Sequence, residues 1–400
     1  MPIPTPFHPR TSNLSKSKEW REWSGYWAAA TYEHTHEREY FAIRNSAALI
    51  DVSPLYKYDI VGPQAAAVVD RMVPRDIRSC EVGQILYTPW CDDDGKVVDD
   101  GTVWRVGQDQ FRITAADPSL RWIQDCGAGL EAEVVDASKS QAALAIQGPN
   151  ARRILLEVAV SDDLAQLPFY YLTQGEIGSA PITITRTGYT GDLGYEIWMD
   201  AEDALEVWDR VMSAGADYGL LPAGLAALDV ARIEAGLLLI EVDYVSSLKA
   251  LTESRRSSPY ELGLGWTVSL DSGDFVGRRA LLEESARRLE WSFVGLEVVW
   301  SDLDRLYAGY DLAPQVAGRA TRDPAPIYVG ERQVGQATSM AFSPMLKTFL
   351  ALATLEQDYA QLGQQVELEM TVEYQRTRVA AKVSRKPFYD PAHKRSLERS

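Results

Sequence analysis

The chain has 400 residues, of which 46% are hydrophobic and 24% charged, a composition typical of a globular protein with two or three domains. Its net charge of −17 argues against a nucleic-acid partner, because phosphate binding needs a basic surface. No apolar run could span a membrane, no signal peptide is recognisable, and 3 cysteines without CxxC spacing suit a reducing compartment. We therefore expect a cytoplasmic protein with no membrane partner and, with only 4 histidines, no metal centre.

The N-terminal segment is rich in aromatic residues. Trp20, Trp23 and Trp27 recur at helical spacing, which predicts a helix with its aromatic face packed in the core. The alternative is that these rings line a binding site for an aromatic or cationic ligand. Core packing is the commoner outcome for such a stripe, and we favour it.

Strand-like and helix-like segments alternate from about residue 56 to 290. "YKYDIVG" at 56–62 is typical of a strand and "PQAAAVVDRMV" at 63–73 of a helix; "DQFRITAA" and "DPSLRWIQDCG" repeat the plan at 109–127. After about residue 290, strand-like segments separated by glycines indicate an all-β module, and the unpatterned stretch 299–322 is expected to be loop. The pattern predicts an α+β protein with an appended barrel or sandwich.

Two adjacent carboxylates occur in "GKVVDDGTVW" at 95–104. If the strand is continuous, Asp99 and Asp100 point to opposite faces. At most one then faces a given pocket, where it could orient an amine or assist proton transfer, and the other should be solvated. The alternative is an ordinary solvated turn.

The stretch "RTGYTGDLGYE" at 186–196 combines glycines, tyrosines and one acid. Glycines allow the backbone to approach a ligand closely, and tyrosines offer flat faces. The carboxylate of Glu196 suits the paired N–H groups of an amidine or a 2-aminopyrimidone. On composition alone, a hairpin loop with surface tyrosines is the commoner outcome.

The segment "AALDVARIEAGLLL" at 226–239 has a helical pattern that ends at Gly236. Asp229 and Arg232 lie one turn apart. Arg232 could bind a ligand carboxylate through two hydrogen bonds. The default alternative is a surface ion pair of small energy.

Taken together, these stretches resemble the glycine-cleavage T-protein (aminomethyltransferase) superfamily. "RTGYTGDLGYE" is similar to its RTGYTGExGxE segment, "ALDVARIEAGLLL" to ARDxxRLEAGxxL, and "ELGLGWTVSLDSGDFVGRRAL" to GLGWxVxLxKxDFxGxxAL. "GKVVDD", "VGQATSMAFSPMLK" and "KPF" also match, in the family's order over nearly the whole chain. The superfamily includes folate-dependent demethylases and the folate-binding half of dimethylglycine- and sarcosine-oxidising enzymes.

The resemblance implies a three-domain cloverleaf around a central tetrahydrofolate pocket. Residues 1–290 would form the folate-binding region, as two interleaved α+β subdomains, and residues 291–400 a C-terminal β-barrel. The resemblance also implies that the protein is a one-carbon transferase. Tetrahydrofolate carries a 2-aminopyrimidone edge, the kind of group that the Glu196 carboxylate is suited to bind. The residues expected to bind the folate are Tyr87, Asp100, Trp104, Tyr189, Glu196, Arg232 and Trp266.

Two residues are expected to act in catalysis. The resemblance assigns Asp100 to orienting or polarising the pterin near N5. Tyr244 lies just beyond the Arg232 helix, and we expect it to donate a proton to a departing oxygen.

Several family motifs are altered. "DVSHM" reads "DVSPL" at 51–55, "GWEMPV" reads "GYWAAATY", the turn NExGG reads "DDDGK", and Leu228 replaces the arginine of ARD. Because the folate-side motifs are retained, these changes favour the same cofactor with a different donor. We therefore expect a demethylase that transfers the methyl group of a small donor to N5 of tetrahydrofolate, with an aryl methyl ether preferred over a sulfonium or methylamine.

Two other functions stay open. A true aminomethyltransferase of glycine cleavage would need a lipoyl carrier protein as partner. A non-catalytic folate-binding protein is the other, although its KGCYxGQE signature is missing from the sequence.

Overall fold

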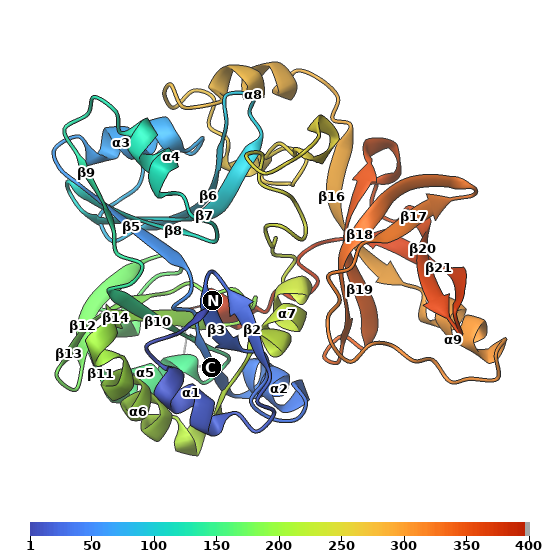
Figure 1. The fold of residues 1–400 in the computed structure, drawn as a ribbon, viewed down its shortest axis with the longest axis horizontal. Helices are drawn as coiled ribbons and strands as arrows, with labels where there is room; N and C mark the ends of the chain where they lie inside the picture. The colour runs from blue at the N-terminus through green and yellow to red at the C-terminus, as the bar shows by residue number, and fades with distance from the viewer. Residues whose placement is uncertain (397–400) are drawn as a thin grey trace.

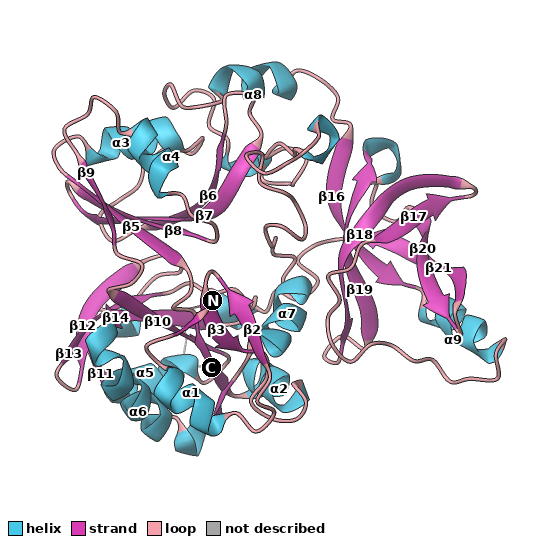
Figure 2. Cartoon of the chain, in the orientation of Figure 1, coloured by secondary structure: helices cyan, strands magenta, loops and turns pink. Residues whose placement is uncertain are grey.

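The computed structural model describes residues 1–396, which form three lobes (Figure 1). One lobe contains a five-stranded sheet, one a seven-stranded sheet, and the third is a closed barrel (Figure 2). The predicted α+β fold with a C-terminal barrel is thus confirmed. Among the helices of residues 1–396, none has the length and hydrophobicity needed to cross a membrane.

The five-stranded sheet is antiparallel. Its strands, in spatial order, are β6 (Ile85–Cys91), β7 (Val97–Gly107), β8 (Gln110–Ala115), β5 (Tyr56–Val61) and β9 (Glu133–Asp136). Helices α3 (Ala65–Met72) and α4 (Leu120–Cys126), both predicted from the sequence, bury Val68, Met72 and Ile123 against it. Helix α8 (Arg278–Ser285) lies at its end beside β6 and β7 (Figure 1).

The seven-stranded sheet interleaves with the first along the chain. Its strands, in spatial order, are β11 (Ala159–Val160), β12 (Leu172–Ile177), β13 (Ala180–Thr185), β14 (Gly194–Asp200), β10 (Gln141–Gln147), β4 (Ala47–Asp51) and β15 (Leu220–Pro222). Helices α1 (His8–Leu14), α5 (Ala151–Val158) and α6 (Ala204–Ala214) lie on its outer side (Figure 1). Helices α2 (Glu37–Asn45) and α7 (Leu225–Glu234) lie toward the barrel.

The aromatic N-terminal segment is a hairpin, so the predicted helix is wrong. Trp20 and Trp23 lie on β2 (Trp20–Trp23) and Trp27 on β3 (Tyr26–Ala29), which also pairs with β1 (Ile3–Pro4). The two-residue turn has positive φ at Ser24 and Gly25, the geometry that joins antiparallel strands most tightly. This turn falls between the tryptophans and breaks the helical repeat that their spacing suggests.

The barrel is closed by six strands. In spatial order these are β16 (Trp291–Val298), β19 (Thr348–Glu356), β18 (Arg332–Ser343), β17 (Ala325–Val329), β20 (Gln365–Val372) and β21 (Gln375–Ser384). The loop predicted at 299–322 is partly wrong, because α9 (Trp300–Ala308) lies there. Leu303 and Tyr307, four residues apart, pack this helix into the barrel core.

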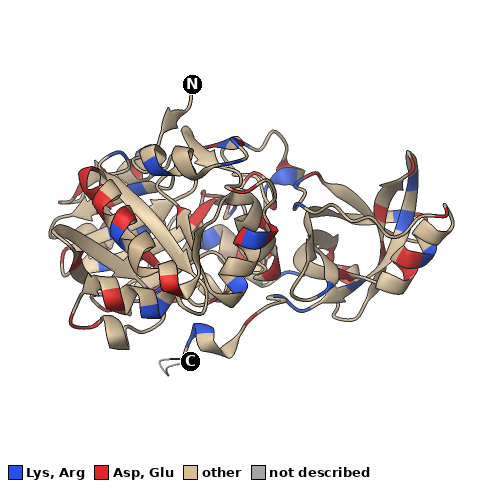
Figure 3. Ribbon diagram, turned by 90° about the horizontal axis from the view of Figure 1, so that it is seen from below, with Lys and Arg blue, Asp and Glu red and all other residues tan. Residues whose placement is uncertain are grey.

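Residues 385–396, which we call the C-terminal segment, leave the barrel and return to the seven-stranded lobe (Figures 1 and 3). Arg186 donates hydrogen bonds to the carbonyls of Lys394 and Ser396 there. Figure 3 also shows that acidic and basic residues are interspersed along the molecule.

Candidate functional site

A central cavity of about 280 Å³ lies between the two sheets. Its walls come from β2, β7, β8, β10, β14, the loop 187–190 and the N-terminal part of α7. Most of the lining is apolar or aromatic, with Trp23, Val52, Trp198 and Ile240 among the contributors. Such a cavity suits a flat organic ligand whose orientation is set by a few polar groups.

Asp100 is one of these polar groups. Its Oδ2 accepts a hydrogen bond from the Tyr87 hydroxyl at 2.7 Å, and its Oδ1 accepts one from the Tyr244 hydroxyl. Burial raises the pKa of the Asp100 carboxyl, while the two phenol hydrogen bonds act in the opposite direction. Both carboxylate oxygens are therefore held by phenols from different segments, and Tyr244 itself does not line either cavity described here.

Asp99 points away from the cavity, as the alternation of the strand predicts. It is not solvated, however, and that part of the prediction is wrong: Asp99 is fully buried. Its carboxylate accepts hydrogen bonds from the backbone N–H groups of Asp100 at 2.8 Å and Asp117 at 3.0 Å. The segment that leads into α4 covers the opposite face of β7 and shields Asp99 from solvent.

Glu196 faces the same cavity from β14. Its Oε2 accepts hydrogen bonds from the hydroxyls of Thr187 at 2.8 Å and Thr185 at 3.3 Å. Burial raises the pKa of the Glu196 carboxyl, and the hydrogen bonds from threonine lower it. Tyr189 also lines the cavity and donates its hydroxyl to the carbonyl of Leu238, which ties the glycine-rich loop to the segment after α7.

The glycines of this loop make room for a side chain that sequence reasoning missed. A Cβ at Gly188 or at Gly194 would lie 2.1 Å from Gln147 Oε1. The buried Gln147 amide donates to the carbonyls of Thr187 and Tyr195 at 3.3 Å and accepts from Thr190 at 2.8 Å. These two glycines are therefore needed to brace the loop, and no local motif marks Gln147 for that role.

Arg232 is fully buried, so the surface ion pair taken as its default is wrong. Its Nη1 donates to Asp243 Oδ2 at 2.6 Å and its Nη2 to Ser339 Oγ at 2.7 Å, while Asp229 lies 3.5 Å from its Nε. Arg232 lines neither the central cavity nor the second cavity described below. The hydrogen bond to Ser339 joins α7 to barrel strand β18. Direct contact between Arg232 and a ligand stays a prediction.

Trp104 also lies behind the cavity wall. It is buried and packs edge-on against Trp198, with ring centroids 4.9 Å apart. Trp198 is the member of the pair that lines the cavity. Trp104 also donates its indole N–H to Thr102, another residue of the lining, at 2.7 Å, so any contribution of Trp104 to ligand binding acts through these two residues.

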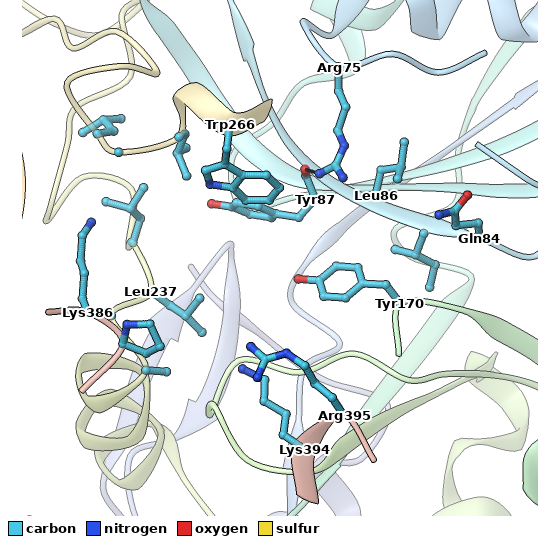
Figure 4. A pocket seen from close by; sticks show the side chains of 18 residues that line it. Arg75, Gln84, Leu86, Tyr87, Tyr170, Leu237, Trp266, Lys386, Lys394 and Arg395 are labelled. Carbon is cyan, nitrogen blue, oxygen red and sulfur yellow. Dashed lines mark hydrogen bonds between the residues drawn. The ribbon is translucent and has the colours of Figure 1, made fainter. Parts of the chain in front are cut away.

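A second cavity of about 530 Å³ adjoins the first (Figure 4). The residues that line both cavities are Tyr87, Tyr170, Leu237 and Leu238. Trp266, which is 64% exposed, stacks near Tyr87 with ring centroids 6.4 Å apart. The shared residues therefore lie at the boundary between the two cavities, and Trp266 lines the second cavity next to it.

The second cavity is basic. Four cations line it, and among the described residues no carboxylate does; the cations are Arg75, Lys386, Lys394 and Arg395. Burial lowers the pKa of the Lys386 ammonium to about 8. None of these four cations is predicted from the sequence as a site residue, although Lys386 belongs to the "KPF" match. Such a lining attracts an acidic ligand.

In the part of the chain that the structure describes, no three His, Cys, Asp or Glu side chains are grouped to hold a metal ion. The polar groups at the two cavities are instead carboxylates, phenols, hydroxyls and cations.

Two family models match the chain. Residues 11–272 match the GCVT N-terminal domain, and residues 312–390 match the glycine cleavage T-protein C-terminal barrel domain. An aminomethyltransferase of Halothermothrix orenii is 34% identical over 354 residues, which are 88% of this chain and 90% of that protein. A trimethylamine-oxide aldolase of Ruegeria pomeroyi is 33% identical over 97% of this chain, which spans only 47% of that relative.

The fold has a counterpart among solved structures. The glycine cleavage system aminomethyltransferase T of Bartonella henselae superposes with a TM-score of 0.81 over 98% of this chain and 99% of that one. At 22% identity this likeness shows the fold alone. On the family models and the relatives, the chain belongs to the glycine cleavage T-protein family, whose members are enzymes that transfer one-carbon units with tetrahydrofolate.

Proposed function

We propose that this protein is a demethylase that moves a methyl group from a small methylated donor to tetrahydrofolate. When bound, tetrahydrofolate supplies N5 as the nucleophile. The observation that carries the proposal is the cluster at Asp100, a carboxylate at the wall of a mainly apolar cavity with both oxygens held by phenols. Methyl transfer is a displacement in which the protein mainly positions the reactants and manages one proton.

The residues present fit tetrahydrofolate. Glu196 offers a carboxylate for the 2-aminopyrimidone edge, with Tyr189 in the same cavity. The cations of the second cavity suit the carboxylates of the folate's glutamate. Tyr87 lines both cavities, and Trp266 lies next to it in the second. The ligand would then extend from the apolar cavity, which suits its flat pterin ring, into the basic cavity, which suits its acidic glutamate.

Asp100 is proposed to handle the proton that methyl transfer releases. Its raised pKa makes it a stronger base than an exposed aspartate. Tyr87 and Tyr244 hold its two oxygens and so act as positioning residues. The proton donation suggested for Tyr244 would have to pass through Asp100, because Tyr244 contacts that carboxylate and lines neither cavity.

The donor would occupy the side of the central cavity nearest the N-terminal hairpin. Trp23 provides an aromatic surface there, which favours an aryl methyl ether. A methylamine or sulfonium donor is the alternative, since the Trp23 ring could also contact a cation. Asp229 lines the same cavity but is already paired with Arg322 at 2.7 Å. The name of the Ruegeria pomeroyi relative also points to methylated amines.

A second candidate is the aminomethyl transfer of glycine cleavage. It is favoured by the relatives named aminomethyltransferase, one of which aligns over 88% of this chain. It would require an aminomethyl group carried on a lipoyl protein and would release ammonia.

Product analysis separates these functions. The protein is incubated with tetrahydrofolate and a panel of methyl ethers, sulfoniums and methylamines, and separately with an aminomethyl-loaded lipoyl carrier. 5-Methyltetrahydrofolate formed without the carrier supports the demethylase. 5,10-Methylenetetrahydrofolate and ammonia formed only with the carrier would overturn it, and so would folate binding without turnover in either reaction.

Replacing Glu196 by glutamine should weaken tetrahydrofolate binding by about ten- to a hundredfold, because charge-assisted hydrogen bonds are lost. Isothermal titration calorimetry measures the effect. Glu176→Gln is the matched control, since Glu176 is exposed on β12 of the same sheet. An unchanged Kd for Glu196→Gln would remove Glu196 from the proposed site.

A further inference from the structure

Two arginines line the central cavity next to the N-terminal hairpin. Arg21 lies on β2, and Arg322 lies in the segment 309–324, which joins α9 to barrel strand β17 and which we call the linker. Both approach Asp229 of α7, whose Oδ2 lies 3.5 Å from Arg21 Nη1 and 2.7 Å from Arg322 Nη2. The hairpin, the linker and α7 therefore bring charged groups together in the lining that also contains Asp100.

The Asp229 carboxylate does not neutralise both arginines. Arg322 donates to Asp229 Oδ2 from Nε at 3.1 Å and from Nη2 at 2.7 Å. Arg21 reaches the same oxygen only at 3.5 Å, and its other N–H groups bond to no described residue. Glu22 also lines the cavity, but its exposed carboxylate accepts from the backbone N–H of Gly25 at 2.7 Å. Two guanidiniums thus share one carboxylate, which leaves one positive charge and several N–H groups for a ligand.

The linker holds Arg322 in position. Arg319 donates to both carboxylate oxygens of Glu19 at 2.6 and 2.7 Å, which ties the linker to the residue before β2. Thr321 exchanges two backbone hydrogen bonds with Met340 of β18, at 2.8 and 3.0 Å. Because its neighbours in the chain are fixed on the hairpin side and on the barrel side, Arg322 loses little conformational freedom when it binds a ligand.

We propose that the methyl donor carries a carboxylate and that Arg21 and Arg322 bind it. This inference rests on the proposed function and names the chemical class of its donor. Guanidinium groups bind carboxylates through paired N–H groups, so two of them beside one cavity select an acid over a neutral compound. The Trp23 ring in the same lining contacts the body of the donor. The donor is then a methoxybenzoate or an N-methylated amino acid, and a neutral ether or a simple amine is disfavoured.

Binding of matched acids and amides tests the inference. One pair is 4-methoxybenzoate and 4-methoxybenzamide, and the other is N,N-dimethyl-β-alanine and its amide. Each is titrated calorimetrically into the protein saturated with folic acid, whose oxidised ring does not accept a methyl group. We expect the wild type to bind at least one acid about tenfold more tightly than its amide. The effect is modest because the side chains of Arg21 and Arg322 are 32% and 39% exposed.

The double variant Arg21→Gln/Arg322→Gln should lose this preference. Arg21→Gln alone keeps the pair between Arg322 and Asp229 and should lose part of it, with the Kd for tetrahydrofolate unchanged, which shows that the cavity is intact. The matched control is Arg121→Gln/Arg332→Gln. These two exposed arginines also pair with carboxylates but line neither cavity, so their loss should leave the preference as it is.

The outcomes separate this inference from the proposed function. If neither acid is preferred over its amide, or if the double variant keeps the preference, the assignment of Arg21 and Arg322 is overturned, while 5-methyltetrahydrofolate formed from a neutral donor would still support a demethylase. If no donor, acidic or neutral, yields 5-methyltetrahydrofolate, the proposed function is wrong. Loss of the preference in Arg75→Gln, with none in the double variant, would place the acid in the second cavity and also overturn the inference.

Discussion

Asp100→Asn is expected to lower kcat for methyl transfer by about a hundred- to ten-thousandfold, the range of general acid–base effects. The amide cannot take up a proton at the wall of the cavity. It also presents an N–H group to one of the two phenols, which now donate to the two oxygens of Asp100. Single-turnover measurements with the donor found in the product analysis would give the rate of the chemical step.

The control for this variant is Asp93→Asn. Asp93 is exposed in the turn that joins β6 to β7, the strand that carries Asp100. It should leave kcat unchanged. Calorimetry on Asp100→Asn should still show binding of tetrahydrofolate, because Glu196 and the basic cavity remain. A normal rate in Asp100→Asn would show that the carboxylate does not handle the proton.

Glu234→Gln is expected to lower the free energy of unfolding by about 3–5 kcal/mol, the usual cost of removing one charge from a buried ion pair. Glu234 and Arg44 are both fully buried, and Glu234 Oε2 lies 2.6 Å from Arg44 Nη2. Glu234 Oε1 accepts hydrogen bonds from Tyr40 and Ser343, each at 2.5 Å. Among residues 1–396, the substitution leaves Arg44 with Asp192, at 3.4 Å, as its one charged partner.

Urea denaturation would measure this loss. Glu283→Gln is the control, because Glu283 forms an exposed pair with Arg287 at 3.8 Å on α8 and should contribute less than about 1 kcal/mol. If the two variants were equally stable, the buried pair would contribute no more than a surface pair.

Part of the central cavity's lining could be predicted because its residues lie in contiguous motifs. Tyr87, Asp100, Tyr189 and Glu196 line the central cavity. Trp104 and Arg232 belong to similar motifs but lie behind its wall, packed on Trp198 and paired with Asp243. A motif therefore predicts that a residue lies close to the site. Whether its side chain lines the cavity depends on how the segments pack against one another.

The basic cavity could not be predicted because it is assembled from distant segments. Arg75, Tyr170 and Lys386 come from three parts of the chain and follow no helical or strand repeat. Tyr170 adopts a positive φ of 64°, which nothing in "LPFYYL" signals. Only the tertiary fold brings these residues together.

Errors in the predicted elements have the same origin. The tryptophan spacing of the N-terminal segment fits a helix, but the turn at Ser24 and Gly25 and the pairing with β1 make it a hairpin. The helix α9 was missed because its buried residues, Leu303 and Tyr307, are few and are separated by charged ones. In both segments the local hydrophobic periodicity is too weak to predict the element, which is decided by contacts with other parts of the chain.

The return of the C-terminal segment to the seven-stranded lobe sets an order of assembly during translation. The ribosome makes residues 386–396 after every strand of both sheets and of the barrel. A nascent chain can thus complete its central cavity before Lys386, Lys394 and Arg395 exist. A protease that cut just after the last barrel strand would remove three of the four cations from the second cavity.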